Sequence, residues 1–168
     1  ITGVDHDGAY EPYIAVSEDA LHSIPDGVEQ QHAAMVEPTS IATRAVIQNS
    51  RVRAGTRVLV EGPGPIGLLT AQVARTQGAE VVVSGIDQDA DYRLPLAEEL
   101  GFETVNVADD DLQAIREERT DGVGYDVVFD TTGHPAGLPS AVEEVRKGGQ
   151  IVLIGQTGET TMPYSPLV

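Results

Sequence analysis

The chain has 168 residues, 40% of them hydrophobic, which is enough to build the core of one folded domain and argues against a disordered segment. Twenty-seven acidic residues face ten basic ones, and the resulting formal net charge of −17 repels nucleic acid and anionic membrane surfaces. The chain has no cysteine, so it holds neither a disulfide nor cysteine-ligated zinc, and it lacks any apolar run of the roughly 20 residues that span a bilayer.

The amino-terminal part of the chain predicts only short elements. It begins without an initiator methionine and without the basic and apolar regions of a signal peptide, so we expect an excised domain or fragment of a cytoplasmic protein. Two strand-like runs over residues 13–16 and 20–24 lead to a turn at residues 25–27. A helix follows over about residues 38–49, with Pro38 in its first turn.

From there on, short apolar strands alternate with amphipathic helices. The predicted strands cover residues 57–61, 81–83, 104–107, 126–130 and 150–154. The predicted helices cover about residues 66–77, 91–100 and 109–118, and a last one carries Leu138, Ala141, Val142 and Val145 on one face and ends at Gly148-Gly149. This alternation predicts an α/β fold, a doubly wound parallel sheet of five strands with helices on both faces, whose ligand lies at the carboxyl ends of the strands.

The loop after the first of these strands matches the pattern G-x-G-x-x-G. It follows a hydrophobic strand and opens an amphipathic helix, which is the context of a dinucleotide-binding Rossmann fold. The first glycine permits the tight turn, the second lets a pyrophosphate approach the backbone, and the third lets helix and strand pack closely. The alternative is a tight turn that binds nothing. The candidate cofactor-binding residues of this loop are Gly62, Pro63, Gly64, Pro65, Ile66 and Gly67.

Two charged residues after the second strand bear on the choice of cofactor. Asp87 lies 20 residues after Gly67, where a carboxylate can accept hydrogen bonds from ribose hydroxyls and repel a 2′-phosphate. It can equally be an ordinary loop aspartate. Arg93 has the opposite effect, since a guanidinium near the ribose favours NADP.

Two further strand ends face the same crevice, and small residues there leave room for the nicotinamide half of the cofactor. The candidate residues at these strand ends are Thr131, Thr132, Gly133, Ile154, Gly155 and Gln156. The alternative is that they form routine turns. The four histidines have no metal-ligand spacing, and we expect exposed polar side chains at His6, His22, His32 and His134.

Several segments together resemble one known family. They are residues 7–13, 24–27, 36–38, 55–60, 62–67, 126–133 and 148–150. In these segments the chain resembles the zinc-dependent medium-chain dehydrogenase/reductase family of the alcohol dehydrogenase superfamily, in particular its polyol (sorbitol-like) and threonine dehydrogenase branch. The resemblance implies a subunit of two domains. Residues 1–25 would be a remnant of a GroES-like catalytic domain, and residues 26–168 an NAD(P)-binding Rossmann domain that stops before its sixth strand.

The resemblance also implies a role for one acidic residue and raises a question about another. Glu37, in the Glu-Pro motif, would lie at the catalytic zinc as a direct or water-mediated ligand, while most zinc ligands would come from the missing domain. Its alternative role is to stabilise the start of a helix. Members that use NAD carry an acid at the end of the second strand, where this chain has Gly85, so the choice between NAD and NADP stays open with a lean to NAD.

By this resemblance, the expected activity is hydride transfer between a secondary alcohol or polyol and NAD(P), with zinc polarising the substrate oxygen. The full-length protein would be a homodimer or homotetramer, and the chain alone would bind cofactor and catalyse little. Three other functions remain: a zinc-independent quinone reductase of the same superfamily, an S-adenosylmethionine-dependent methyltransferase, and a non-catalytic sensor of NAD(H). The Glu37-Pro38 pair argues against the first, and zinc-ligand residues in the missing amino-terminal region would decide it. Glycines at alternate positions of the loop would favour the second, and a parent gene without a catalytic domain would favour the third.

The excess of acidic residues needs its own interpretation. The acids are scattered over predicted helices and loops instead of forming one tail. We interpret them as a solvated surface adapted to high salt (a halophilic protein), where repulsion between like charges is screened. The alternative is a basic partner that docks on one face.

Overall fold

The computed structural model describes residues 3, 5, 7–155 and 158–162, and the chain divides into two compact units, Ile1–Ala34 and Met35–Val168. The first unit holds a short 3-10 helix, η1 (Glu18–Ala20), and one helical turn, α1 (Gln30–Ala33). Its predicted turn is confirmed, since the Val28 N–H donates to the carbonyl of Pro25 and Gly27 has a φ of +87°. No helix in the described part of the chain is long and apolar enough to cross a membrane.

The two strands predicted for the first unit are wrong. Residues 13–16 and 20–24 form no strand, and the first residue of the second run, Ala20, belongs to η1. The apolar side chains of Tyr13 and Leu21 are 89% and 63% exposed, so they do not pack against a sheet. A strand exists only when a neighbouring strand satisfies its backbone, and two short runs without a third strand or a packing face do not supply that.

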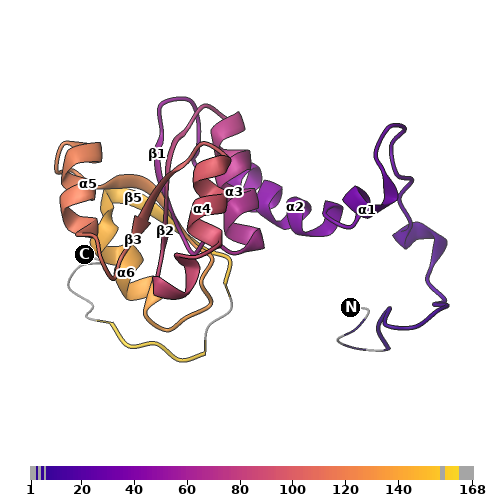
Figure 1. Cartoon of the computed structure of the whole chain (residues 1–168). Coiled ribbons are helices and arrows are strands. Elements are labelled where there is room, and N and C mark those ends of the chain that lie inside the picture. Colours follow the sequence, from indigo (N-terminus) through magenta and orange to yellow (C-terminus); the bar gives the residue numbers. More distant parts are fainter. Residues whose placement is uncertain (1–2, 4, 6, 156–157, 163–168) are drawn as a thin grey trace. The chain divides into compact units, whose positions relative to one another are not determined.

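The second unit contains a parallel sheet of five strands in the order β3-β2-β1-β4-β5 (Figure 1). This order confirms the predicted doubly wound topology, in which β1 lies at the centre and pairs with β2 on one side and β4 on the other. The described strands are β1 (Arg57–Glu61), β2 (Glu80–Gly85), β3 (Glu103–Asn106), β4 (Tyr125–Asp130) and β5 (Val145–Leu153).

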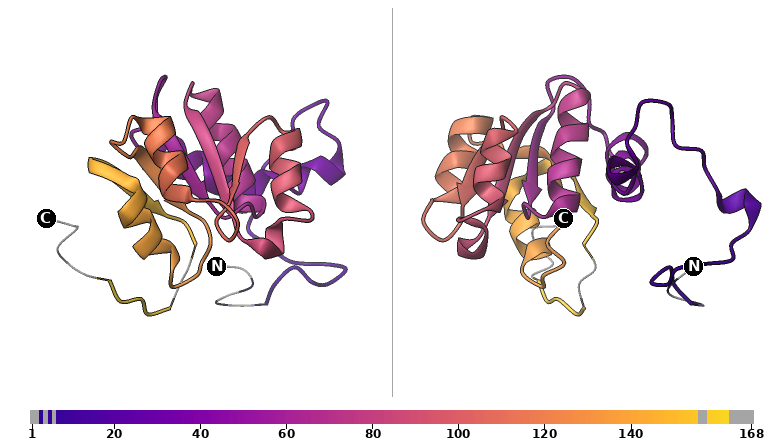
Figure 2. Two further views of the ribbon diagram at one scale, coloured as in Figure 1. Left: turned by 60° about the vertical axis from the view of Figure 1, so that its left-hand side comes forward. Right: turned by 45° about the vertical axis from the view of Figure 1, so that its right-hand side comes forward.

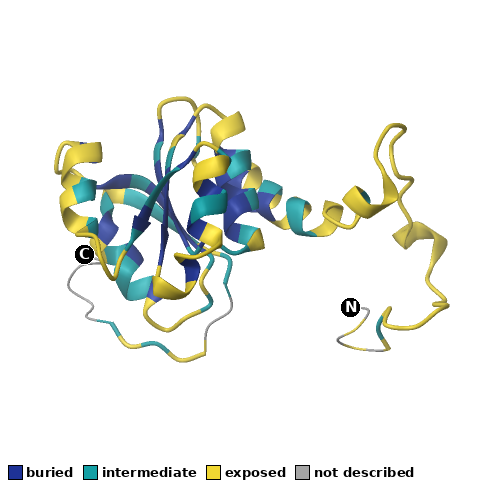
Figure 3. Ribbon diagram, viewed as in Figure 1, coloured by how far each residue is buried: buried dark blue, intermediate teal, exposed yellow. Residues whose placement is uncertain are grey.

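Helices cover both faces of this sheet, as the right-hand view of Figure 2 shows for α3 and α5. One apolar core joins the sheet to the helices before and after β1 and β2, and a second core joins the other face to the last two helices. Figure 3 shows the buried residues concentrated in the strands and in α3. The helices of this unit are α2 (Val36–Thr43), its π-helical continuation η2 (Arg44–Gln48), α3 (Pro65–Thr76), η3 (Asp87–Asp89), α4 (Arg93–Glu99), α5 (Leu112–Thr120) and α6 (Gly137–Glu144).

The largest boundary correction concerns the last helix and strand. We expected the helix to include Val145 and to end at Gly148-Gly149, but α6 ends at Glu144 and Val145 opens β5. The β-branched Val145 pairs with Tyr125 of β4, and the register between the two strands shifts before Val127 pairs with Gln150. The two glycines therefore lie in an irregular stretch of the strand, where a side chain at Gly149 would overlap the side chain of Val145.

Candidate functional site

The Gly-rich loop begins at the carboxyl end of β1, in the middle of the sheet. Gly62 has a φ of +96°, a conformation that residues with a Cβ rarely adopt, and its N–H donates to the carbonyl of Ser84 on β2 at 2.9 Å. A Cβ at this position would lie 3.1 Å from Oγ1 of Thr131. The first glycine of the motif is therefore needed both for its backbone conformation and for the close approach of the β4 end.

Thr131 ties this loop to the end of the neighbouring strand. Its hydroxyl lies 2.8 Å from the carbonyl oxygen of Glu61 and 2.9 Å from that of Gly62, and it donates to both. A Cβ on Gly67 would overlap the carbonyl of Gly62 and lie 2.7 Å from Oγ1 of Thr131. The third glycine thus lets α3 start directly against the turn, as the motif predicts.

Gly64, the second glycine, differs from the other two because a side chain added there would have open space among the described residues. It precedes Pro65, the first residue of α3, and has an ordinary extended backbone with φ −69° and ψ 176°. Among the described residues, a Cβ here would meet no heavy atom within 4 Å, and no side chain caps the helix start. The first N–H groups of this 12-residue helix are therefore open to an anion that approaches over Gly64.

At the end of β2, the two predicted ribose-reading residues are both engaged with neighbours. Asp87 is exposed, and its Oδ1 accepts a hydrogen bond from Nδ2 of Asn106 at 3.1 Å. Arg93 forms an ion pair of 3.0 Å with Oδ1 of Asp89. Asp87 and Asp89 both lie in η3, so the segment between β2 and α4 begins with a short helical turn.

Asp89 is a site residue that the sequence pattern did not single out. Its side chain is only 8% exposed, and its Oδ2 accepts a hydrogen bond from the backbone N–H of Ile86 at 3.1 Å. The same oxygen lies 3.1 Å from the place that a Cβ on Gly85 would occupy. A carboxylate therefore stands at the end of β2 although the strand itself ends in glycine. The spacing of Asp89 and Arg93, four residues apart, was the one available signal of their pairing.

The ends of β4 and β5 lie side by side, as predicted. The N–H groups of Ile154 and Gly155 donate to the carbonyl of Asp130, at 2.9 and 3.1 Å, and a Cβ on Gly155 would overlap the backbone of Gly133. The hydroxyl of Thr132 donates to Oδ1 of Asp130 at 2.6 Å. These contacts bring together the candidate residues of both strand ends except Gln156, which lies outside the described residues.

Two buried acids lie at the carboxyl ends of β1 and β4, and one of them contacts α6. Glu61 and Asp130 are register partners on β1 and β4 and are 4% and 0% exposed. Glu61 accepts a hydrogen bond from the hydroxyl of Ser140 at 2.6 Å, yet Oε2 of Glu61 and Oδ2 of Asp130 are buried without a partner in the described residues. Burial raises the pKa of Glu61 to about 8, against the opposing effect of Ser140 and with the help of the charges on Asp130 and Glu144.

Glu37, the candidate zinc ligand, lies in the first turn of α2 and is exposed. Within the described residues, no three His, Cys, Asp or Glu side chains come together in a way that could hold a metal ion. The expectation of exposed histidines is confirmed for His22, His32 and His134, whereas His6 lies outside the described residues. The described residues therefore contain an open helix start after the Gly-rich loop, and among them Glu37 belongs to no group of three side chains that could hold a metal ion.

Comparison with known proteins agrees with this geometry. Residues 65–168 match the family model described as zinc-binding dehydrogenase. The chain is 36% identical over 164 residues to the sorbitol dehydrogenase of Halalkalibacterium halodurans, covering 97% of this chain and 47% of that protein. It is 34% identical over 169 residues to the L-threonine 3-dehydrogenase of Anaeromyxobacter sp., covering 99% and 48%.

Among solved structures, L-idonate 5-dehydrogenase from Escherichia coli superposes with a TM-score of 0.83 at 29% identity, covering 96% of this chain and 45% of that one. The 2R,3R-butanediol dehydrogenase of Bacillus subtilis gives 0.73 at 34% identity, covering 86% and 41%. The chain therefore spans about half the length of the curated relatives that it matches.

Proposed function

The chain belongs to the zinc-binding dehydrogenase family, and from that membership we propose that it is the nicotinamide-dinucleotide-binding half of an alcohol or polyol dehydrogenase. The proposed reaction is hydride transfer between a secondary alcohol and the nicotinamide. Sorbitol and L-threonine dehydrogenases are among the relatives that support this class of substrate. The proposal extends to the whole protein, of which this chain would supply the cofactor domain.

The observation that carries the proposal is the glycine-lined start of α3. Gly62 and Gly67 shape the turn, and Gly64 leaves the helix start open to a pyrophosphate. The ends of β4 and β5, at residues 131–133 and 154–155, would hold the nicotinamide half. When bound, the dinucleotide supplies the hydride acceptor, and this chain's residues bind and orient it.

We propose NAD as the cofactor, because the end of β2 carries negative charge. Asp87 is exposed there, and Asp89 occupies the space beside Gly85. Arg93 is already paired with Asp89, so its positive charge is partly neutralised and is less available to bind a 2′-phosphate. Two carboxylates and one paired guanidinium favour ribose hydroxyls over a phosphate at this point.

The described residues alone do not supply a set of ligands for zinc, because no three His, Cys, Asp or Glu side chains come together among them. Glu37 would contribute one ligand, directly or through water, and residues 1–25 would be the end of the catalytic domain that supplies the others. We also propose that the whole protein acts in the cytoplasm as a homodimer or homotetramer on a small alcohol or polyol.

The test is a calorimetric titration of the 168-residue chain with NAD, NADH, NADP, NADPH and S-adenosylmethionine in molar salt. We expect NAD(H) to bind more tightly than NADP(H). Tighter binding of NADP(H) would reverse the proposed preference, and binding of S-adenosylmethionine alone would overturn the proposed function.

A single methyl group tests the open helix start. We expect Gly64→Ala to weaken NAD binding at least roughly tenfold, because its Cβ stands where the pyrophosphate must approach. Its free energy of unfolding should change by less than about 0.5 kcal/mol, since the Cβ meets nothing in the folded chain. Gly158→Ala is the matched control, since Gly158 also lies in open space, and it should leave both quantities unchanged. Equal NAD affinity in the two variants would contradict the assignment.

A further inference from the structure

Three of the ten basic residues of this acidic chain lie together at the opposite end of the sheet from the Gly-rich loop. Arg51 and Arg53 precede β1, and Arg146 is the second residue of β5. They line a cavity of about 400 Å³ at the amino ends of β1, β4 and β5. This volume falls in the range of small-molecule sites, which is roughly 300–1,000 Å³.

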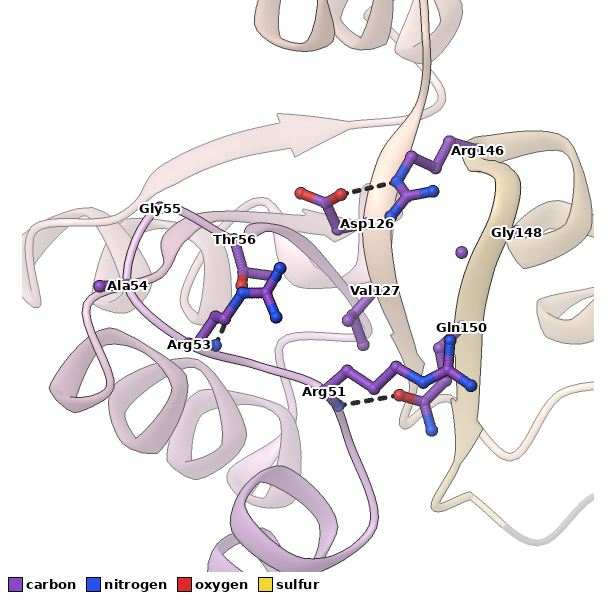
Figure 4. A pocket seen from close by; sticks show the side chains of 11 residues that line it. Arg51, Arg53, Ala54, Gly55, Thr56, Asp126, Val127, Arg146, Gly148 and Gln150 are labelled. Atoms are coloured by element: carbon purple, nitrogen blue, oxygen red, sulfur yellow. Dashed lines mark hydrogen bonds and ion pairs between the residues drawn. The ribbon is translucent and has the colours of Figure 1, made fainter.

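Figure 4 shows how these side chains border one space. Arg51 and Arg53 come from the segment before β1, and Arg51 extends toward β5, beside Gln150. Arg146 approaches from the other side, together with Asp126 of β4. Asp126 is the one acidic residue among the described residues that line the cavity, against three arginines.

The negative charge of Asp126 is already engaged. Its Oδ1 accepts from Nε of Arg146 at 2.6 Å, and its Oδ2 accepts from the backbone N–H of Arg57 at 2.9 Å. Partial burial would raise the pKa of Asp126, but these hydrogen bonds and the positive charges of the two arginines outweigh it and lower the pKa. The carboxylate therefore stays ionised and fixes Arg146 at the wall of the cavity.

Arg51 and Arg53, the other two arginines of the cavity, have hydrogen-bonded backbones and guanidinium groups without a partner in the described residues. The N–H of Arg51 donates to Oε1 of Gln150 at 2.9 Å, and the N–H of Arg53 donates to Oγ1 of Thr56 at 3.0 Å. Neither guanidinium has a hydrogen bond or an ion pair within the described part of the chain. In a chain with 27 acidic residues, two guanidinium groups without a carboxylate partner at one cavity are an arrangement that an anion would complete.

We propose that this cavity is a second ligand site, distinct from the cofactor crevice, which binds the phosphate group of a small anionic molecule. A phosphate carries two negative charges and several acceptor oxygens, which suit three planar guanidinium groups better than a single carboxylate does. The cavity volume suits a small molecule and not a folded segment of protein. The phosphate group can be free or part of a sugar phosphate.

The test is a residue-resolved NMR titration of the 168-residue chain with inorganic phosphate and, separately, with glucose 6-phosphate. Potassium chloride is held at one concentration at which the chain is folded. We expect saturable shifts of the backbone N–H signals of Thr56 and Gln150. Tighter binding of glucose 6-phosphate would identify an organic phosphate as the ligand, and equal or weaker binding would identify the free ion. Because the Gly62–Gly67 signals are read in the same spectra, phosphate at the cofactor loop is seen separately, and a failure of either site leaves the other measurable.

Charge-matched variants separate the site from the general charge of the chain. Arg51→Gln and Arg53→Gln should each weaken phosphate binding about fivefold to tenfold, because each removes a charged donor. Arg44→Gln removes one positive charge from an exposed arginine of η2, outside the cavity, and should weaken binding by less than about twofold.

Three outcomes would overturn the proposal. One is the absence of saturable shifts at Thr56 and Gln150, and another is an equal loss of affinity in Arg44→Gln and Arg53→Gln. The third is shifts that depend on protein concentration without any phosphate, which would assign the cavity to an acidic segment of a second copy of the chain.

Discussion

Glu61 shows how a single buried carboxyl group links the fold to pH. It lies at the end of β1 and is 4% exposed, and the hydroxyl of Ser140 is the only hydrogen-bond partner of its carboxyl group in the described residues. Burial raises its pKa to about 8, so the folded chain keeps a proton that the unfolded chain releases near pH 4.5. Burial likewise raises the pKa of Glu144 to about 7. Between pH 4.5 and the raised pKa of each group, the folded state binds more protons than the unfolded state. The free energy of unfolding must therefore fall as the pH rises through this range.

Glu61→Gln tests this link. The amide keeps an acceptor for Ser140 and has no charge at any pH, so the variant should lose less stability than the parent chain between pH 6 and 8. We expect the difference to be on the order of 2 kcal/mol, measured by urea unfolding across this range. Glu99→Gln, at an exposed position on α4, is the control and should follow the parent chain. Parallel pH curves for Glu61→Gln and the parent would show that Glu61 is already ionised when folded.

Gly67 tests the packing of the loop, in contrast to the open position of Gly64. A methyl group at Gly67 overlaps the carbonyl of Gly62 and the hydroxyl of Thr131, so the loop or the helix must move. We expect Gly67→Ala to destabilise the chain by about 1–3 kcal/mol, the usual range for overpacking, whereas Gly64→Ala does not. Denaturant unfolding of the two variants measures the difference, and equal stabilities would mean that the turn is more adaptable than its contacts indicate.

At the scale of elements, α5 begins where one side chain fixes it. Asp111 is its N-cap, and Oδ1 of Asp111 accepts a hydrogen bond from the N–H of Ala114 at 3.1 Å. The sequence suggested a start near residue 109, because Asp109 and Asp110 also suit a helix start. Those two acids instead bind Asn106 at the end of β3, with Asp109 accepting from its side chain and Asp110 from its backbone N–H.

Asp111→Ala should therefore cost about 1 kcal/mol of stability, the usual effect of losing an N-cap. Asp91→Ala is the matched control, because it removes the same charge from an exposed aspartate with no partner in the described residues. Thermal unfolding of both variants checks the prediction, and a similar loss in both would point to net charge and not to the cap.

The elements that could be predicted are those whose signals are local. The short apolar run over residues 57–61 predicted β1 with its bounds, and the glycine pattern placed the loop and the start of α3 within one residue. The start of β5 could not be predicted, since it depends on pairing with Tyr125, some 20 residues away. The cavity lined by Arg51, Arg53 and Arg146 could not be predicted for the same reason, because only the folded chain brings these arginines together.

At the scale of the whole molecule, charge is the dominant feature. The formal net charge of −17 means that acidic side chains repel one another in the compact state. Salt screens this repulsion, since the Debye length falls from about 10 Å at 0.1 M to about 3 Å at 1 M. We therefore expect the midpoint of thermal unfolding to rise with potassium chloride and to level off near molar concentration. A midpoint that is unchanged between dilute buffer and molar salt would contradict an acidic surface adapted to high salt.

The central position of β1 also sets the order in which the sheet can assemble during synthesis on a ribosome. Once residue 106 has emerged, β1, β2 and β3 can pair, and one apolar face can close against α3 and α4. The other edge of β1 then stays open until Tyr125–Asp130 of β4 arrives. A partial sheet in which one edge of β1 is still unpaired is exposed to association with a neighbouring nascent chain. We expect the net negative charge of the chain to oppose such association.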